Sequence, residues 1–497
     1  MSKPWYIIAW SMNKKISYYV GNQALAFSDV YLLPAYSDIK SRHGGQIDTK
    51  TPIALGAPKL NIPIISAGMD TVTEDAMAET FALNGGLGEI HRNNTPEKQA
   101  ELVTLVKERV RVMEKNPPTV AQSATIADAL NLLEKRHRGY VIITPKENFT
   151  GDFIGIATSR DFKAASPDTS IAQVMTKLSR LVTVPQGTTL QKAFQIMRQR
   201  RIEKIPVINK SGKLIGVYTT KDYEFIQNHP NAVTDSQGRL IVGAAIGVQE
   251  IDIDRAHRLV RAGVDVLFLD IAHGHSIYTK TMLKRLKDKE KITTPIIVGN
   301  IASTEGVKMA CDIGADGIKI GIGPGFVCKT RNVAGTGVPQ ITAILEARAA
   351  LSRHKNPPPI IADGGIREPG DVPKAIAAGA DSVMIGSLLA GTDQSPGDII
   401  KIDGSLQKRI RGMASKGVFE DRKKIGETTT NSNLYTPEGR ETFTPFQGSS
   451  QQFINEYVGG LRSAMSYAGV HSIPELQKAG LIHVSSSGAN EQGRALS

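Results

Sequence analysis

The chain has 497 residues, of which 40% are hydrophobic and 22% charged, and a formal net charge of +12. This length exceeds what one ordinary core holds, so two or three domains are expected. The apolar run at residues 6–10 is too short to span a bilayer and lacks a secretory cleavage pattern. Two cysteines exclude a disulfide framework, and the absence of Cys/His clusters argues against zinc. We therefore expect a cytoplasmic protein with no membrane partner.

Basic residues are scattered along the chain and are not interleaved with aromatic residues. This arrangement favours solvated helix faces over a specific nucleic-acid site. The positive charge fits an anionic small-molecule substrate equally well.

Short β-branched runs that end in glycine-rich loops alternate with amphipathic helical stretches from residue 60 onward, and again after about residue 240. The predicted strands lie within 61–70, 264–274, 294–301, 316–325, 358–365 and 381–387. Helices are predicted within 303–315 and 368–380, and several end in AGA, AGV or IGA, where glycine takes the left-handed cap. Continuous apolar strands separated by helices indicate a parallel α/β sheet covered by helices. The number of repeats favours a (β/α)8 TIM barrel over an open sheet.

Residues 117–226 interrupt this pattern with an internal repeat of about fifty residues. We therefore predict a discontinuous catalytic barrel, 1–116 and 227–497, with an inserted module of two halves, about 117–170 and 171–226. The halves end in similar stretches, IGIATSRDF and IGVYTTKDY, and resemble a tandem CBS (Bateman) module. The resemblance implies a regulatory purine nucleotide, ATP or GTP, at Thr158, Asp161, Thr219 and Asp222. A purely architectural module that sets oligomer contacts is the alternative.

The loops that follow the strands of such a barrel share one face, which carries the active site. Side chains and glycines far apart in the sequence should therefore converge there: Asp70, Asp270, Gly299, Asn300, Cys328, Asp363 and Gly386.

One of these loops, GIGPGFVCKTRNVAGTG at 321–337, holds the more promising of the two cysteines. A lone cysteine after a strand is more often a small buried hydrophobe than a nucleophile. Neighbouring Lys329 and Arg331, together with free loop amides, favour a thiolate, and the glycines allow close approach of a flat ligand. Cys311 lies in a helical stretch without such neighbours, so we expect it to be a core residue.

Long motifs along nearly the whole chain carry a further resemblance. The stretch GIGPGFVCKTRNVAGTGVPQITAI is similar to the catalytic loop of the IMP dehydrogenase / GMP reductase family. The other matching stretches are SAGMDTVTE (66–74), DIAHGHS (270–276), GNIAS (299–303), IADGGIR (361–367), MIGSLLAGT (384–392), RGMAS (411–415) and GGLRSAMSYAG (459–469).

The resemblance implies that Cys328 attacks C2 of a purine nucleotide and forms a covalent thioimidate. It implies substrate contacts from Ser66, Met69, Asp363, Gly365, Gly386, Ser387, Met413 and Glu438. Asp363 would hold the ribose hydroxyls, the loops at 365 and 386–387 the 5′-phosphate, and Glu438 the base edge. Nicotinamide-cofactor contacts are implied for Asp270, Ala272, Ser276, Asn300, Gly321 and Gly323, and a possible K+ for the backbone of Gly323, Gly325 and Cys328. For Asp270 and Asp363 the alternative is a loop cap or turn residue.

Within this family, dehydrogenases carry an Arg-Tyr pair on a mobile flap, where the arginine activates water. Reductases pair a threonine after the cysteine with a flap glutamate that passes protons to the leaving amine. The flap here, about 413–439, contains no Arg-Tyr dipeptide, and GVFEDR (417–422) resembles the reductase flap. The predicted catalytic residues are therefore Cys328, Thr330 and Glu420, although Glu420 is also readable as a solvated loop carboxylate.

We expect an NADPH-dependent GMP reductase that forms a homotetramer or octamer. IMP dehydrogenase using NAD is the first alternative, because the regions MDTVTE and GGLGEIHRN read like its bacterial members. Phe326 and Ile410 replace a serine and a tyrosine that bind phosphate in the dehydrogenase, which motivates a second alternative, a catalytically impaired nucleotide-binding regulator.

Overall fold

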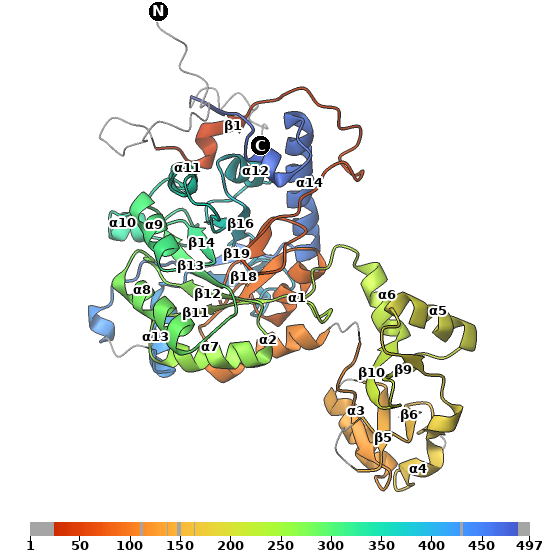
Figure 1. The fold of residues 1–497 in the computed structure, drawn as a ribbon. Coiled ribbons are helices and arrows are strands. Elements are labelled where there is room, and N and C mark those ends of the chain that lie inside the picture. Colours follow the sequence, from red (N-terminus) through yellow and green to blue (C-terminus); the bar gives the residue numbers. More distant parts are fainter. Residues whose placement is uncertain are drawn as a thin grey trace, which may run out of the picture. The chain divides into compact units, whose positions relative to one another are not determined.

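The computed structural model describes residues 24–109, 113–136, 138–146, 151–163, 165–427 and 431–485. The described chain forms two compact units (Figure 1). The first takes its residues from 1–109, 231–235 and 240–497, and the second from 110–230 and 236–239. The second unit extends a few residues beyond the predicted 117–226 at both ends.

Eight parallel strands close into a barrel in the first unit, as predicted. Around the barrel they are β11 (Gly243–Ile246), β12 (Val266–Asp270), β13 (Ile296–Ile301), β14 (Gly317–Ile320), β15 (Ile360–Asp363), β16 (Ser382–Ile385), β2 (Ile64–Ser66) and β3 (Leu87–Ile90). The predicted runs contain six of these strands. The short strands β3 and β11 had not been predicted, because their glycines and alanines weaken the β-branched signal.

Helices surround the barrel (Figure 1). They are α1 (Asp75–Leu83), α2 (Pro96–Arg109), α7 (Ile251–Ala262), α8 (Ile277–Lys284), α9 (Thr304–Asp312), α11 (Gln340–Leu351), α12 (Asp371–Ala377) and α14 (Ser450–Ala468). Helix α7 shows why these helices pack on the barrel: its Ile253, Ala256 and Leu259 recur at helical spacing, form one apolar face and are buried. It ends at Gly263, whose φ of 91° is the left-handed cap predicted from the AGV motif.

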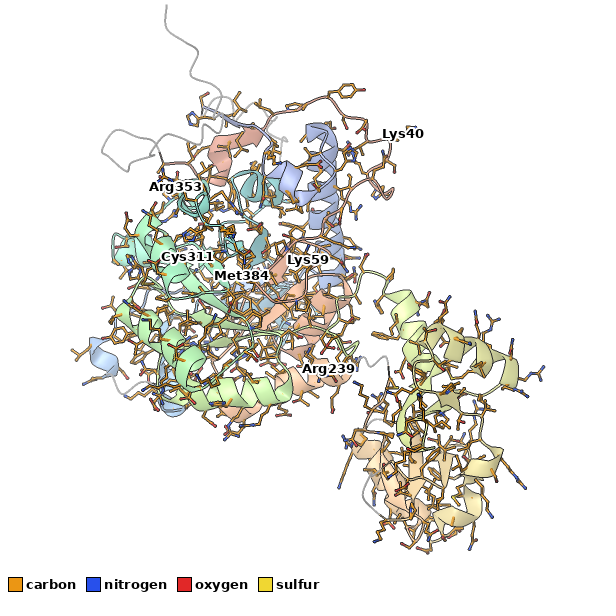
Figure 2. All side chains as sticks on the ribbon, viewed as in Figure 1. Lys40, Lys59, Arg239, Cys311, Arg353 and Met384 are labelled. Carbon is orange, nitrogen blue, oxygen red and sulfur yellow. The ribbon has the colours of Figure 1, made fainter. Side chains whose placement is uncertain are left out.

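Figure 2 marks Met384 on β16 within the barrel and Cys311 on α9 in the helical layer. Cys311 is only half-buried, and burial raises the pKa of its thiol to about 11, with Asp312 adding to the shift. A thiol with such a pKa is a poor nucleophile near neutral pH, which agrees with a packing role.

A small antiparallel sheet at 400–445 carries the segment predicted to form the flap. It consists of β17 (Ile400–Ile402), β18 (Ser405–Arg411) and β19 (Glu441–Pro445), and helix α13 (Lys416–Lys424) lies between β18 and β19 in the chain. Strand β1 (Val30–Leu32) pairs with β20 (Leu481–His483), and the short helices α10 (Thr330–Val333) and α15 (Ile473–Leu476) complete this unit.

The second unit consists of two halves with the same order of strand, helix, strand, strand. The first half comprises β4 (Thr119–Ala121), α3 (Ile126–Arg136), β5 (Tyr140–Thr144), β6 (Gly155–Thr158), α4 (Ile171–Val174) and β7 (Thr176–Lys177). The second comprises β8 (Val184–Pro185), α5 (Leu190–Arg200), β9 (Lys204–Ile208), β10 (Leu214–Thr219) and α6 (Thr220–Asn228). Each half thus has its own sheet, ordered β4-β5-β6-β7 and β10-β9-β8. In the described parts of both units, no helix combines the length and apolarity that crossing a membrane requires.

Candidate active site

Cys328 lies in the loop that leaves β14 at the carboxyl end of the barrel strands. Its thiol is half-buried and donates a hydrogen bond to Thr330 Oγ1 at 3.2 Å. The nearby Arg331 guanidinium donates instead to the Val338 carbonyl at 2.7 Å and thereby closes the loop. The cysteine and threonine predicted to act together are therefore in direct contact.

The end of the flap runs along this loop as a short antiparallel pair. The Lys329 amide donates to the Glu438 carbonyl at 2.6 Å, and Cys328 bridges to Gly439. The Glu438 amide in turn donates to Ala414 at 3.1 Å, which brings the neighbourhood of Met413 to the same place. The structure thus places the backbone of Glu438 beside the nucleophile.

Glu420 lies on α13 and is half-buried. Among the residues that the structure describes, its carboxylate has no hydrogen-bond or ionic partner, and Thr330 is not joined to it. The position predicted for the proton-donating glutamate is therefore on the flap, but not in contact with the threonine.

A buried lysine links the two aspartates predicted to hold ribose and cofactor. Lys319 Nζ lies 3.0 Å from Asp270 Oδ1 and 2.8 Å from Asp363 Oδ2. Asn300 Nδ2 also donates to Asp363 Oδ2, at 2.8 Å. Burial opposes the charge of Lys319, but Asp270 and Asp363 outweigh it and raise the lysine pKa. Three strands of the barrel, β12, β14 and β15, are thereby tied together by one ammonium group.

The loops predicted to bind substrate approach each other closely. A Cβ added to Gly386 would lie 2.9 Å from Met69 Sδ, and one added to Gly365 would lie 3.2 Å from Pro324 in the loop of the nucleophile. Ser66 is buried at the end of β2 and accepts from Thr73 Oγ1 at 3.0 Å. Ser387 follows Gly386 directly after β16. Close backbone approach of this kind suits a flat nucleotide and an anion held by amides.

The predicted cofactor residues divide into two kinds. Ser276 caps α8, because its Oγ accepts from the Thr279 amide, and Ala272 is exposed in the loop before it. Asn300 Oδ1 is buried without a hydrogen-bond partner among the described residues. An unpaired amide oxygen beside Asp270 fits the carboxamide of a nicotinamide ring.

Gly321 and Gly323 are needed for packing of the loop itself. A Cβ on Gly321 would lie 2.1 Å from the Asp363 carbonyl, and one on Gly323, at a φ of 89°, 2.6 Å from Arg331 Cγ. The Gly325 carbonyl accepts from the Cys328 amide at 3.1 Å, so part of the backbone proposed for K+ is already engaged. No group of three or more His, Cys, Asp or Glu side chains that could hold a metal occurs among the described residues.

Phe326 and Ile410 stand in different surroundings. Phe326 is 57% exposed in the loop of the nucleophile, whereas Ile410 is fully buried in β18 opposite Thr442. Ile410 is thus part of a packed strand. Nothing in the described structure explains why a phenylalanine is exposed at position 326.

Sequence reasoning missed three charged residues at this site. Lys319 and Glu89 are buried inside barrel strands, and Arg422 lies on α13. The signal that was available is a charged residue inside an otherwise apolar strand run, as in GIKIGIG and GGLGEI.

Arg422 is a flap guanidinium whose pKa Asp270 influences electrostatically, although no Arg-Tyr dipeptide is present. Its side chain is 22% exposed, and its Nε lies 3.7 Å from Glu427 Oε2. Burial, and then the neighbouring Arg92, lower its pKa to about 10, against the influence of Glu427, Asp270 and Tyr435. The structure therefore supplies a guanidinium that is easier to deprotonate than an ordinary arginine.

The second unit contains a cavity of about 270 Å³ between its two halves. Thr158, Thr219 and Asp222 line it, together with the basic Arg138, Arg160, Lys204 and Lys221. Asp161 does not line the cavity but accepts from the amide and hydroxyl of Thr158 at 2.7 and 2.8 Å. Glu114 and Glu203 also line the cavity and pair with Arg138 and with Arg160 and Lys204, respectively. Three of the four predicted nucleotide residues thus share one cavity of mixed charge.

The fold and the site together define the class of protein: a (β/α)8-barrel enzyme that binds a nucleotide. The features that define it are the cysteine loop, the two linked aspartates and the glycine-lined loops. The family model described as the IMP dehydrogenase / GMP reductase domain matches residues 24–494, so the chain belongs to this family. It is a purine-nucleotide oxidoreductase.

Relatives carry both names. Inosine-5′-monophosphate dehydrogenase of Aquifex aeolicus (strain VF5) is 43% identical over 479 residues, which are 94% of each chain. GMP reductase of Leishmania donovani is 40% identical over 481 residues, covering 95% of this chain and 96% of the relative. A cysteine-to-alanine variant of GMP reductase from Trypanosoma brucei, in complex with guanosine 5′-monophosphate, superimposes with a TM-score of 0.86 at 38% identity, over 95% of this chain and 98% of that one. The T. brucei enzyme in complex with guanosine 5′-triphosphate has a TM-score of 0.76 at 35% identity, over 94% and 98%.

Proposed function

We propose that this protein is a GMP reductase, which converts GMP to IMP and ammonia. The observation that carries the proposal is the flap, about 413–439, which contains no Arg-Tyr dipeptide and places Glu420 on α13 within the stretch GVFEDR. The Cys328 thiol contacts Thr330 Oγ1 at 3.2 Å, on a loop paired with the flap segment of Glu438, and this cysteine–threonine pair fits both enzymes of the family. Support also comes from the Leishmania donovani reductase and from the GMP-bound reductase structure.

In this proposal the Cys328 sulfur adds to C2 of the purine, and the C2–N bond to the amino group breaks. Thr330 relays the proton that the departing amine needs, since its hydroxyl both accepts and donates hydrogen bonds. NADPH, when bound, supplies the hydride that replaces the sulfur at C2. Asp363 holds the ribose, Asp270 and Asn300 face the nicotinamide, and Lys319 keeps both aspartates in place.

Two reaction mixtures test the proposal: GMP with NADPH, and IMP with NAD. Turnover is expected in the first, and Cys328→Ala should abolish it while nucleotide binding persists. Turnover confined to the second mixture would refute the reductase assignment. Nucleotide binding without turnover in either mixture would identify a regulator instead.

Two carboxylates compete for the role of proton donor. Glu420 is the residue that the flap motif proposes, and Glu438 is the one on the segment bonded to the nucleophile loop. Glu420→Gln and Glu438→Gln should therefore be compared at equal nucleotide saturation. The true donor is the one whose loss lowers kcat by about 10²-fold or more, whereas a residue that only contacts the base raises KM.

IMP dehydrogenase is the second candidate, and Arg422 is the observation that favours it. A flap guanidinium whose pKa is lowered to about 10 is suited to activating water. If the protein is a dehydrogenase, Arg422→Gln abolishes XMP formation, whereas Lys423→Gln, a change at the neighbouring exposed residue, leaves it unchanged.

For the second unit we propose that a purine nucleotide binds the cavity between its two halves and regulates the enzyme. The support is the lining of Thr158, Thr219 and Asp222, with Lys221 beside them, and the GTP complex of the related reductase. Thr219→Ala should remove any effect of ATP or GTP on rate or particle size. If neither nucleotide shifts rate or size in the intact protein, the module is architectural.

A further inference from the structure

Glu89, on strand β3, is a fully buried carboxyl group that the proposed reaction does not use. Neither of its oxygens has a hydrogen-bond partner among the described residues. The Gly68 amide lies close enough to favour the charged form without completing hydrogen-bond geometry. A buried carboxyl group left unpaired in this way costs free energy, and the cost is smaller when the group is neutral than when it is ionised.

The charged neighbours of Glu89 come from strands on other sides of the barrel. They are Asp270 on β12, Lys319 on β14 and Asp363 on β15. Only a side chain that points into the barrel interior can meet groups from all three strands. Glu89 therefore belongs to the Lys319 network that links the two aspartates.

The charges in this network do not balance if every group is ionised. Three carboxylates would face one ammonium, which leaves two uncompensated negative charges in a buried site. Burial, and then Asp270, raise the pKa of Glu89 well above its ordinary value, and Asp363 adds to this, whereas Lys319 and the Gly68 amide oppose it. Retaining the proton on Glu89 lowers the excess to one charge, and the Lys319 ammonium is then shared by Asp270 and Asp363 alone.

Glu89 also supports the substrate loop directly. A Cβ added to Gly68 would lie 2.8 Å from Glu89 Cδ, so the loop that carries Met69 rests on the carboxyl group. A change in charge or shape at Glu89 therefore affects both the Met69 loop and the two aspartates, Asp270 and Asp363.

We propose that Glu89 is a positioning residue: its buried carboxyl group keeps Lys319 shared between Asp270 and Asp363 and supports the Met69 loop. The proposal rests on the proposed function, in which Asp363 holds the ribose of the nucleotide and Asp270 faces the cofactor. Ionisation of Glu89 adds a negative charge beside Asp363 and draws Lys319 away from it. Nucleotide binding is then expected to weaken at alkaline pH.

The test measures the Kd of GMP and of IMP by calorimetry between about pH 7 and pH 9.5 for the wild type and for Glu89→Gln, so that ionisation of the nucleotide itself, which both proteins share, cancels in the comparison. The wild-type Kd is expected to rise about fivefold or more beyond the rise seen for Glu89→Gln across this range. Glu89→Asp keeps an ionisable carboxyl group, so the Kd of this variant should rise with pH as in the wild type. Glu346→Gln is the matched control, because Glu346 is a buried carboxylate on α11 that accepts from Thr304; it should titrate like the wild type.

Infrared spectroscopy gives a second readout that does not depend on turnover. At about pH 7 the wild type should show the carbonyl band of a protonated carboxylic acid, and this band should be missing in Glu89→Gln. A Glu89→Gln titration superimposable on that of the wild type, or no such difference band, overturns the proposal. Failure of GMP reduction alone would leave the binding and infrared results intact, so the two proposals fail separately.

Discussion

Replacing Lys319 by methionine tests the charge network at the floor of the site. Methionine keeps the length and apolar stem but removes the ammonium that lies 3.0 Å from Asp270 and 2.8 Å from Asp363. Removing one partner of a buried ion pair costs about 3–5 kcal/mol, because the remaining charge is left uncompensated. Asp270 and Asp363 are 26% and 20% exposed, so water can partly solvate them. We therefore expect a loss of about 3 kcal/mol in the free energy of unfolding of the barrel, at the lower end of that range.

Urea denaturation followed by circular dichroism measures this loss. Lys98→Met is the matched control, since Lys98 forms an exposed pair with Glu101 at 3.1 Å and both side chains are more than half exposed. That variant should lose less than about 1 kcal/mol. A Lys319→Met protein that is as stable as the Lys98→Met protein would refute the reasoning that Lys319 compensates buried carboxylates.

Three further predictions follow from separate parts of the chain. In α14, Gly459→Ala should stabilise the protein by up to about 1 kcal/mol, because nothing lies within 4 Å of the added Cβ. Gly460→Ala should destabilise it, because its Cβ would lie 2.6 Å from Pro369 Cβ. Thermal unfolding distinguishes the two variants, and equal shifts in Tm would contradict this packing. The pKa of His471 is raised, chiefly by the hydrogen bond of its ring to the Gln46 carbonyl and then by the one to the Asp38 carboxylate. Its stabilisation is therefore full below about pH 6.5 and is lost as pH rises through the folded pKa, so the loss of Tm in His471→Gln should be larger at about pH 5.5 than at about pH 8.5. Iodoacetamide should label Cys328 and spare Cys311, whose thiol pKa is about 11; mass spectrometry that finds the reverse would contradict the assignment of the nucleophile.

The flap segment is attached to the barrel by the buried carboxylate of Glu427, just after α13. Glu427 accepts from Arg92 Nη1 at 2.6 Å and from Arg255 Nη2 at 2.7 Å. Arg255 is itself held by the Asn94 carbonyl and by Gln99 Oε1. Arg422, on the same segment, lies against this carboxylate, with its Nε 3.7 Å from Glu427 Oε2.

Much of the fold was predictable because its signal is local. Apolar β-branched runs ending in glycine-rich loops indicate parallel strands, and the AGV motif indicates the left-handed cap found at Gly263. The contact of Cys328 with Thr330 was also predictable, since the two residues are close in sequence. The short strands β3 and β11 were missed because glycine and alanine carry little β signal.

The amino-acid sequence by itself determined the alternation of strands and helices, the internal repeat and the loop that carries the nucleophile. Only the tertiary structure decided which charged groups meet: Lys319 with Asp270 and Asp363, Glu89 beside them, and Glu438 rather than Glu420 along the nucleophile loop. The physical reason is the barrel itself. It brings together side chains from strands far apart in the chain, and a buried charge acquires its role from neighbours that sequence spacing does not reveal.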